Sequence, residues 1–221
     1  ISFGTPSTFN SSNINRPTPV YDSANDKVVI VYEDVGATSQ GKAIVAEVNP
    51  STNAITYGSP VTFNSNPSYH IGATYDSTNG KVVIAYADWG NSMHGHAIVG
   101  EVSGTSISFP SSATKFVSYI VDVPHELVHD PVNNKVVILY RTSGDQTYYG
   151  KAIVGTISGT SISFPGSHAE FSPVYGTGYY WPVYDSTSGK IVIFYAKNSG
   201  KAIAGTVSGN SISFGSPFEV E

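Results

Sequence analysis

Residues 211–217 read Ser-Ile-Ser-Phe-Gly-Ser-Pro, and the chain opens with almost the same phrase, Ile-Ser-Phe-Gly-Thr-Pro at residues 1–6. The phrase recurs three more times inside the chain, which makes five copies of one short segment: 1–9, 54–63, 106–116, 161–171 and 211–220. The rest of the repeat occurs only four times. Internal repeats at a fixed period identify repeat architectures, so the mismatch between five and four bears on both fold and function.

Four aspartates mark the same point in the four full units and are spaced by 54, 54 and 55 residues: Asp22, Asp76, Asp130 and Asp185. A small polar turn follows each aspartate. Then comes Lys-Val-Val-Ile or Lys-Ile-Val-Ile, closed by a tyrosine: Tyr32, Tyr86, Tyr140 and Tyr195. Segments this short, rich in Val, Ile and Tyr and bounded by Gly, Ser, Asn and Asp, are typical of β-strands. The apolar runs predict strands buried on both faces.

A unit of about 54 residues with four strands has roughly the size of a propeller blade. We therefore predict an all-β protein with a single domain, 1–221, that forms a four-bladed β-propeller of antiparallel strands closed by pairing of its terminal strands. The predicted units are approximately 10–63, 64–116, 117–171 and 172–221, with 1–9 as an extra outer strand. An open β-solenoid is the structural alternative, although solenoid repeats are usually shorter.

Composition excludes several classes of protein. The chain has no cysteine, only 12% charged residues and a net charge of −5, and it shows no basic patch of the kind that binds nucleic acid. No run approaches 18 apolar residues, so we predict no membrane span. Abundant Ser, Thr, Asn, Gly and Tyr with few charges favours an extracellular or cell-surface location. Asn10-Ser11-Ser12 is a glycosylation sequon that would suit a surface loop.

One segment matches a catalytic signature. His125-Glu126-Leu127-Val128-His129 has the H-E-x-x-H pattern of zinc metallopeptidases, which requires a helix to bring both histidines to one metal. Here the repeat places the segment on a strand, where the two histidines would lie about 13 Å apart at roughly 3.3 Å per residue. We therefore predict a chance match, and no catalytic residue, metal or cofactor.

The four repeated aspartates allow two interpretations. They could line a central channel and hold a cation. Each also precedes a turn, where an aspartate side chain caps the backbone that follows it. The turn-capping role is the prediction that we carry forward.

The loops that differ between units carry exposed aromatic and histidine side chains, which are the candidate ligand-binding residues: Trp89, His94, Tyr148, Tyr149 and Tyr179. Flat rings can stack on a sugar and can equally form a protein interface. For Tyr180 and Trp181, which align with the innermost strands of other units, packing within the fold is an equal alternative.

The chain as a whole resembles repeat-built β-propellers of secreted and cell-surface proteins, although no Trp-Asp, kelch or Asp-box signature is present. The resemblance implies the fold and little about function, because propellers include enzymes, lectins and scaffolds.

The fifth copy of the outer strand suggests a function. A surplus apolar strand exposes unpaired backbone groups. It can extend its own blade, be the cut end of a longer array, or complete a neighbouring molecule. We predict the last, a non-catalytic extracellular subunit that polymerises with itself head to tail, and a glycan-binding module is the alternative. The predicted assembly residues are Ile1, Phe3, Ile212, Phe214 and Phe218.

Overall fold

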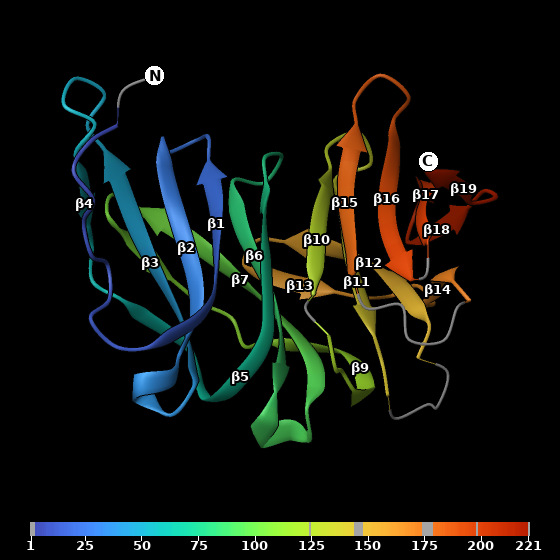
Figure 1. Cartoon of the computed structure of the whole chain (residues 1–221), viewed down its shortest axis with the longest axis horizontal. Coiled ribbons are helices and arrows are strands. Elements are labelled where there is room, and N and C mark those ends of the chain that lie inside the picture. Colours follow the sequence, from blue (N-terminus) through green and yellow to red (C-terminus); the bar gives the residue numbers. More distant parts are fainter. Residues whose placement is uncertain (1–2, 124, 144–147, 174–178, 198, 221) are drawn as a thin grey trace.

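The computed structural model describes residues 3–123, 125–143, 148–173, 179–197 and 199–220. Within these ranges the chain is all-β and has no α-helix, as predicted. Its strands form three antiparallel sheets, one of nine strands and two of five (Figure 1). Two short 3₁₀ turns, η1 (Val35–Ala37) and η2 (Trp89–Asn91), lie in the loops after the second strands of the first two units.

The repeat of the sequence is a repeat of structure, and we call the four copies units 1 to 4. Unit 1 contains β1 (Ile14–Asp22), β2 (Lys27–Asp34), β3 (Gln40–Val48), β4 (Ile55–Tyr57) and the start of β5 (Val61–Asp76). Unit 2 contains the rest of β5, β6 (Lys81–Asp88), β7 (His94–Ser103), β8 (Ser106–Ser108) and β9 (Thr114–Ile120).

The last two units repeat the same order. Unit 3 contains β10 (Glu126–Asp130), β11 (Lys135–Arg141), β12 (Gly150–Ser158), β13 (Ser161–Ser163) and β14 (Ala169–Ser172). Unit 4 contains β15 (Tyr179–Asp185), β16 (Lys190–Lys197), β17 (Ser199–Ser208), β18 (Ser211–Phe214) and β19 (Phe218–Val220).

Turns capped by aspartate join the first two strands of every unit. In unit 1 a carboxylate oxygen of Asp22 accepts hydrogen bonds from the backbone N–H groups of Ala24 and Asn25, at 3.0 and 3.1 Å. Asp76 and Asp130 accept the equivalent pairs of backbone bonds in units 2 and 3. Asp185 accepts a backbone bond from Thr187. The prediction that these aspartates cap turns is confirmed.

The outer strand of each unit differs from the single strand that the sequence suggested. It is split into two short pieces that both pair with the third strand: in unit 3, β13 and β14 lie along different parts of β12. The Gly/Ser/Pro segment between the pieces causes the break, because Pro lacks the N–H that a strand ladder needs. In unit 1 the second piece runs directly into the inner strand of unit 2, so that β5 joins both units into the nine-stranded sheet.

The hydrophobic core lies between units. We call the face of a sheet that packs on the following unit its forward face, and the face that packs on the preceding unit its rear face. Val29, Val31 and Val45 on the forward face of unit 1 share a cluster with Val82 and Ile84 on the rear face of unit 2. The two further clusters join unit 2 to unit 3 and unit 3 to unit 4 in the same way. Three such junctions hold the molecule together.

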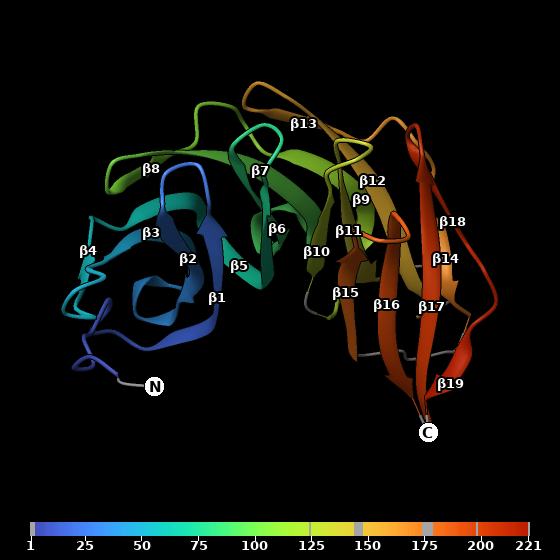
Figure 2. The same cartoon turned by 90° about the horizontal axis from the view of Figure 1, so that it is seen from above.

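The units follow one another in an arc (Figure 2). Their inner strands touch in succession, β1 against β5, β5 against β10, and β10 against β15. Within the described residues, β1 and β15 make no contact of comparable extent, and β19 pairs only with β17. Units 1 and 4 therefore form the two ends of the stack, with no strand pairing between the termini among those residues.

Candidate functional site

Among the described residues, no other unit covers the forward face of unit 4. Its side chains come from four neighbouring strands that the register places side by side, with Trp181 opposite Phe194 and Val183 opposite Val192. Phe218 of β19 lies opposite Ala202 and joins the same face. We call this set the open forward face: Trp181, Val183, Val192, Phe194, Ala202, Ala204 and Phe218.

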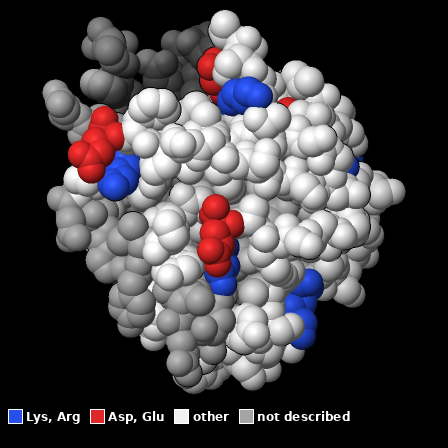
Figure 3. Space-filling model, turned by 90° about the vertical axis from the view of Figure 1, so that its right-hand side faces the viewer, with Lys and Arg blue, Asp and Glu red and all other residues white. Residues whose placement is uncertain are grey.

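Exposure separates this face from its counterparts. Phe194 occupies the repeat position of Val31, Ala85 and Leu139; it is 43% exposed, whereas each of those three is fully buried. The side chains of Trp181, Val183 and Phe218 are at least half exposed. Figure 3 shows the molecule from the side of unit 4, where charged side chains are few and most lie in pairs of opposite sign. A contiguous exposed apolar patch of this kind marks an interaction surface.

The opposite end of the stack is covered only in part. Val28 and Ile30 on the rear face of unit 1 are half-buried, whereas the matching Val82 and Ile84 of unit 2 are fully buried. Val48 and Ile55 on the same face are exposed. We call Val28, Ile30, Val48 and Ile55 the open rear face. The two ends of the molecule thus present the two halves of one junction.

At each junction the residue before the repeated aspartate reaches toward the aspartate turn of the preceding unit. The Tyr75 hydroxyl lies 3.2 Å from the Ala24 backbone nitrogen in the Asp22 turn. His129 Nε2 lies 2.9 Å from the carboxylate of Asp76. Tyr184 has the same position at the junction of units 3 and 4. Its pKa is raised by burial and then by the negative charge of Asp130, the aspartate of the preceding turn.

The contact with His129 helps to explain why the carboxyl group of Asp76 has a lowered pKa. Burial alone would raise the pKa of the Asp76 carboxyl, but hydrogen bonds from His129 and Asn79 outweigh burial and lower that pKa to about 2. At the two ends the same groups lack this partner: Tyr21 is 56% exposed and donates to Asp26 of its own turn, and Asp185 lies in an exposed turn.

The N-terminal segment lies on the rear side of unit 1. The Phe9 ring packs edge-on against Tyr32, with centroids 5.5 Å apart, and lies 6.0 Å from Tyr57. Phe116 meets Tyr140 and Phe164 in the same way at the junction of units 2 and 3, at 5.3 and 5.6 Å. The surplus strand copy therefore occupies the place that the outer strand of a preceding unit takes at every other junction.

The predicted assembly residues fall into different environments. Ile212 is buried in the cluster between units 3 and 4, and Phe214 packs against the same cluster. Phe3 and Phe218 are largely exposed, and Ile1 lies outside the described residues. Sequence reasoning missed Val183 and Phe194, because their counterparts in the other units are core residues. Their position in the last unit is the only sequence signal that distinguishes them.

The predicted ligand-binding residues do not converge on one site. Trp89 is exposed and packs edge-on against Tyr69, at 6.1 Å between ring centroids. With Met93 and Ile120 it borders a hollow of about 440 Å³. His94 begins β7 next to this hollow, directly after Met93 and opposite Ile120. The other three lie on units 3 and 4: Tyr148 lies under the Arg141 guanidinium at 5.8 Å, Tyr149 precedes β12, and Tyr179 begins β15 and stacks on Trp181.

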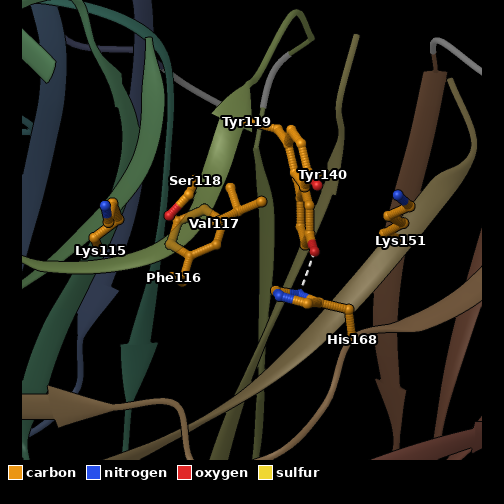
Figure 4. A pocket seen from close by; sticks show the side chains of 8 residues that line it. All are labelled: Lys115, Phe116, Val117, Ser118, Tyr119, Tyr140, Lys151 and His168. Carbon is orange, nitrogen blue, oxygen red and sulfur yellow. Dashed lines mark hydrogen bonds between the residues drawn. The ribbon is translucent and has the colours of Figure 1, made fainter. Parts of the chain in front are cut away.

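A smaller hollow lies at the junction of units 2 and 3 (Figure 4). It has a volume of about 320 Å³, and the aromatic rings of Phe116 and Tyr140 are among the groups that line it. The Tyr140 hydroxyl is hydrogen-bonded to Nδ1 of His168. Burial and the nearby Lys151 charge lower the pKa of His168, which favours a neutral imidazole that accepts this bond.

Four residues of the H-E-x-x-H segment, Glu126 to His129, lie on strand β10 as predicted, whereas His125 directly precedes that strand. His125 is fully buried, and its Nδ1 lies 2.6 Å from the backbone carbonyl oxygen of His70. His129 instead contacts Asp76 in the neighbouring unit. The two imidazoles therefore serve separate contacts between inner strands. Among the described residues, no three His, Cys, Asp or Glu side chains group as metal ligands.

No helix among the residues that the structure describes is long and apolar enough to cross a bilayer. Neither the protein-family models nor the curated proteins include a match to this chain. The candidate site therefore rests on geometry alone: two apolar sheet faces, at opposite ends of one stack, that match the faces joined inside the molecule.

Proposed function

We propose that this chain is a non-catalytic structural subunit that assembles head to tail with further copies of itself. The open forward face of one copy packs on the open rear face of unit 1 of the next copy. The observation that carries the proposal is the exposure of Phe194, whose counterparts are fully buried at all three internal junctions. The apolar side chains around Phe194 form one exposed patch, and a patch of this kind marks an interaction surface.

The occupant follows from continuity with the internal junctions. Each of them joins a forward face to a rear face of the same repeat, so the best-fitting partner for unit 4 is unit 1 of a second copy. The inner-strand contacts support the same pairing. Tyr21 of the incoming copy would meet the Asp185 turn, as Tyr75 meets the Asp22 turn within the chain.

The four units are best interpreted as four blades of a propeller-type stack whose ends are completed by assembly. A head-to-tail contact is heterologous, so repeated addition gives either a closed ring or an open filament. The low charge and the Ser, Thr, Asn and Tyr content support an extracellular fibre or surface layer as the setting of this polymer.

Light scattering after size exclusion, followed by electron microscopy of the untagged chain at near-physiological salt, tests the proposal. Phe194→Glu places a charge in the centre of the interface and should leave only monomers, while the parent forms larger species. Val132→Glu is the matched control, because Val132 is 76% exposed in a turn of unit 3. A monomeric parent, or equal assembly by both variants, would contradict the proposal.

A glycan-binding role is the second candidate, and the exposed Trp89 beside its hollow is the observation that favours it. An aromatic ring at the rim of a hollow can stack on the apolar face of a sugar. Glycan-array binding that falls when Trp89→Ala is introduced, but is unchanged in Phe194→Glu, would support this role. Binding that is unaffected by Trp89→Ala would exclude the Trp89 hollow.

A further inference from the structure

We propose that the joint between copies is a strand exchange with a defined register: residues 7–9 of one copy replace β19 as the partner of β17 in the preceding copy. This inference rests on the proposed head-to-tail assembly and adds which strand is exchanged. Residues 3–10 and 214–221 are copies of one segment, in which residues 7–9 correspond to β19, and a single joint has room for only one of these two strands.

The N-terminal segment is already held as an outer strand should be. Gly4 lies against the backbone carbonyl of Asn53 as Gly58 lies against that of Thr105, each so close that a Cβ atom would clash. Asn10 Nδ2 lies 3.4 Å from a carboxylate oxygen of Asp34, and Asn64 reaches the equivalent Asp88 at 3.2 Å. Together with the Phe9 ring contacts, these two contacts hold the N-terminal segment on unit 1 in the way that residues 58–64 are held on unit 2.

The backbone of this segment lacks the partner that its counterparts have. Residues 61–64 pair with β3, and the start of β9 pairs with β7. Within the described part of the chain, residues 3–10 belong to no strand and enter no backbone–backbone hydrogen bond. The strand that would complete the backbone hydrogen bonds of residues 7–9 is the third strand of a preceding unit, the equivalent of β3 and β7. In a head-to-tail assembly that strand is β17 of the neighbouring copy.

The side-chain pattern indicates which of the two segments remains in the joint. At the three internal junctions a small or β-branched residue is followed two positions later by phenylalanine: Val61 and Phe63, Thr114 and Phe116, Ala169 and Phe171. Ser7 and Phe9 match this pattern, whereas Phe218 and Val220 reverse it. β19 has only three residues, and Phe218 is 73% exposed. β19 is therefore the strand that is displaced, and Phe218 leaves the open forward face with it, while the other six residues of that face remain to pack on the next copy.

The internal register fixes the contact to be tested. Thr62 pairs with Lys42 and Glu219 pairs with Lys201, so Thr8 should pair with Lys201 of the neighbouring copy. Opposed residues in an antiparallel pair have Cα atoms about 4.5–5.5 Å apart, which suits a disulfide. The chain has no cysteine to interfere. Thr8 belongs to the segment on unit 1 and Lys201 to β17 of unit 4, the two ends of the arc in Figure 2, so we expect the link to form between copies.

The experiment oxidises the full chain carrying Thr8→Cys and Lys201→Cys and measures mass on non-reducing gels. We expect covalent dimers and larger species that return to monomers on reduction. Lys42→Cys with Thr62→Cys, in the same register inside unit 1, should close within each chain. Thr8→Cys with Thr206→Cys places the second thiol elsewhere on β17 and should link at least tenfold less.

Two outcomes would overturn the exchange. One is that Thr8→Cys with Lys201→Cys forms no link while the intrachain control closes, and the other is equal linking by the pair that carries Thr206→Cys. If the parent still assembles, and Phe194→Glu abolishes that assembly, the head-to-tail function stands while the exchange fails. If the parent never assembles, the proposed function fails as well.

Discussion

His125 shows how one residue can look catalytic in the sequence and be structural in the fold. It is fully buried between β5 and β10, with its Nδ1 on the backbone oxygen of His70 and its ring edge-on to Phe116 at 5.5 Å. Burial, offset in part by the hydrogen bond to His70, lowers the pKa of His125 to about 3. The pKa of His70 falls to about 4, chiefly through burial.

These two pKa values predict that the protein loses stability at a pH well above the one at which ordinary carboxylates become protonated. Between pH 6.5 and about 4 the unfolded chain binds protons that the folded chain refuses, so the free energy of unfolding falls as pH falls. The slope approaches about 1.4 kcal/mol per pH unit for each proton withheld. His125→Asn keeps a neutral donor and should reduce the fall in Tm between about pH 7 and pH 4.5, measured by circular dichroism. An unchanged fall would contradict this account.

At the scale of elements, the aromatic trio at each junction decides how an outer strand is held. Phe171 packs against Tyr195 and Phe214 at 5.9 and 6.1 Å and is almost fully buried. Phe9 makes the same kind of contact on unit 1 but is only half-buried, because no preceding unit covers it. The phenylalanine at this repeat position is therefore a core residue in unit 3, as Phe171, and partly exposed to solvent on unit 1, as Phe9.

This difference predicts unequal costs for the same substitution. Phe171→Ala should lower the free energy of unfolding by about 3–5 kcal/mol, the usual range for a buried phenylalanine. Phe9→Ala should cost markedly less in the monomeric Phe194→Glu background and should weaken assembly in the parent. Urea denaturation gives the first quantity and light scattering the second. Equal losses of stability at the two positions would show that the N-terminal segment belongs to the folding core.

At the scale of the whole molecule, the fold is an arc of four units in which each hydrophobic cluster joins one unit to the next. Stability in such arrays is close to a sum of unit and junction terms. The three internal junctions are complete, and each end leaves half a junction facing solvent. Adding a copy completes one more junction without changing the core of any existing one.

Assembly of this kind links stability to protein concentration. Because association favours the folded state by mass action, the Tm of the parent chain should rise with concentration. The Tm of Phe194→Glu should stay constant over the same range, and that of Val132→Glu should follow the parent. Differential scanning calorimetry at concentrations spanning about two orders of magnitude makes this measurement. A parent Tm independent of concentration would indicate that the ends do not associate.

The sequence by itself determined the local structure. The Asp76 turn and the strand that begins at Lys81 form through contacts between residues that are close in the sequence. The sequence pattern therefore predicted the turn and the strand in every unit. It also placed Glu126 to His129 of the H-E-x-x-H segment on a strand. Only the tertiary structure decided which faces are covered, because burial depends on what lies beside a unit. Leu139 and Phe194 occupy the same repeat position, yet unit 4 covers Leu139 and no unit covers Phe194.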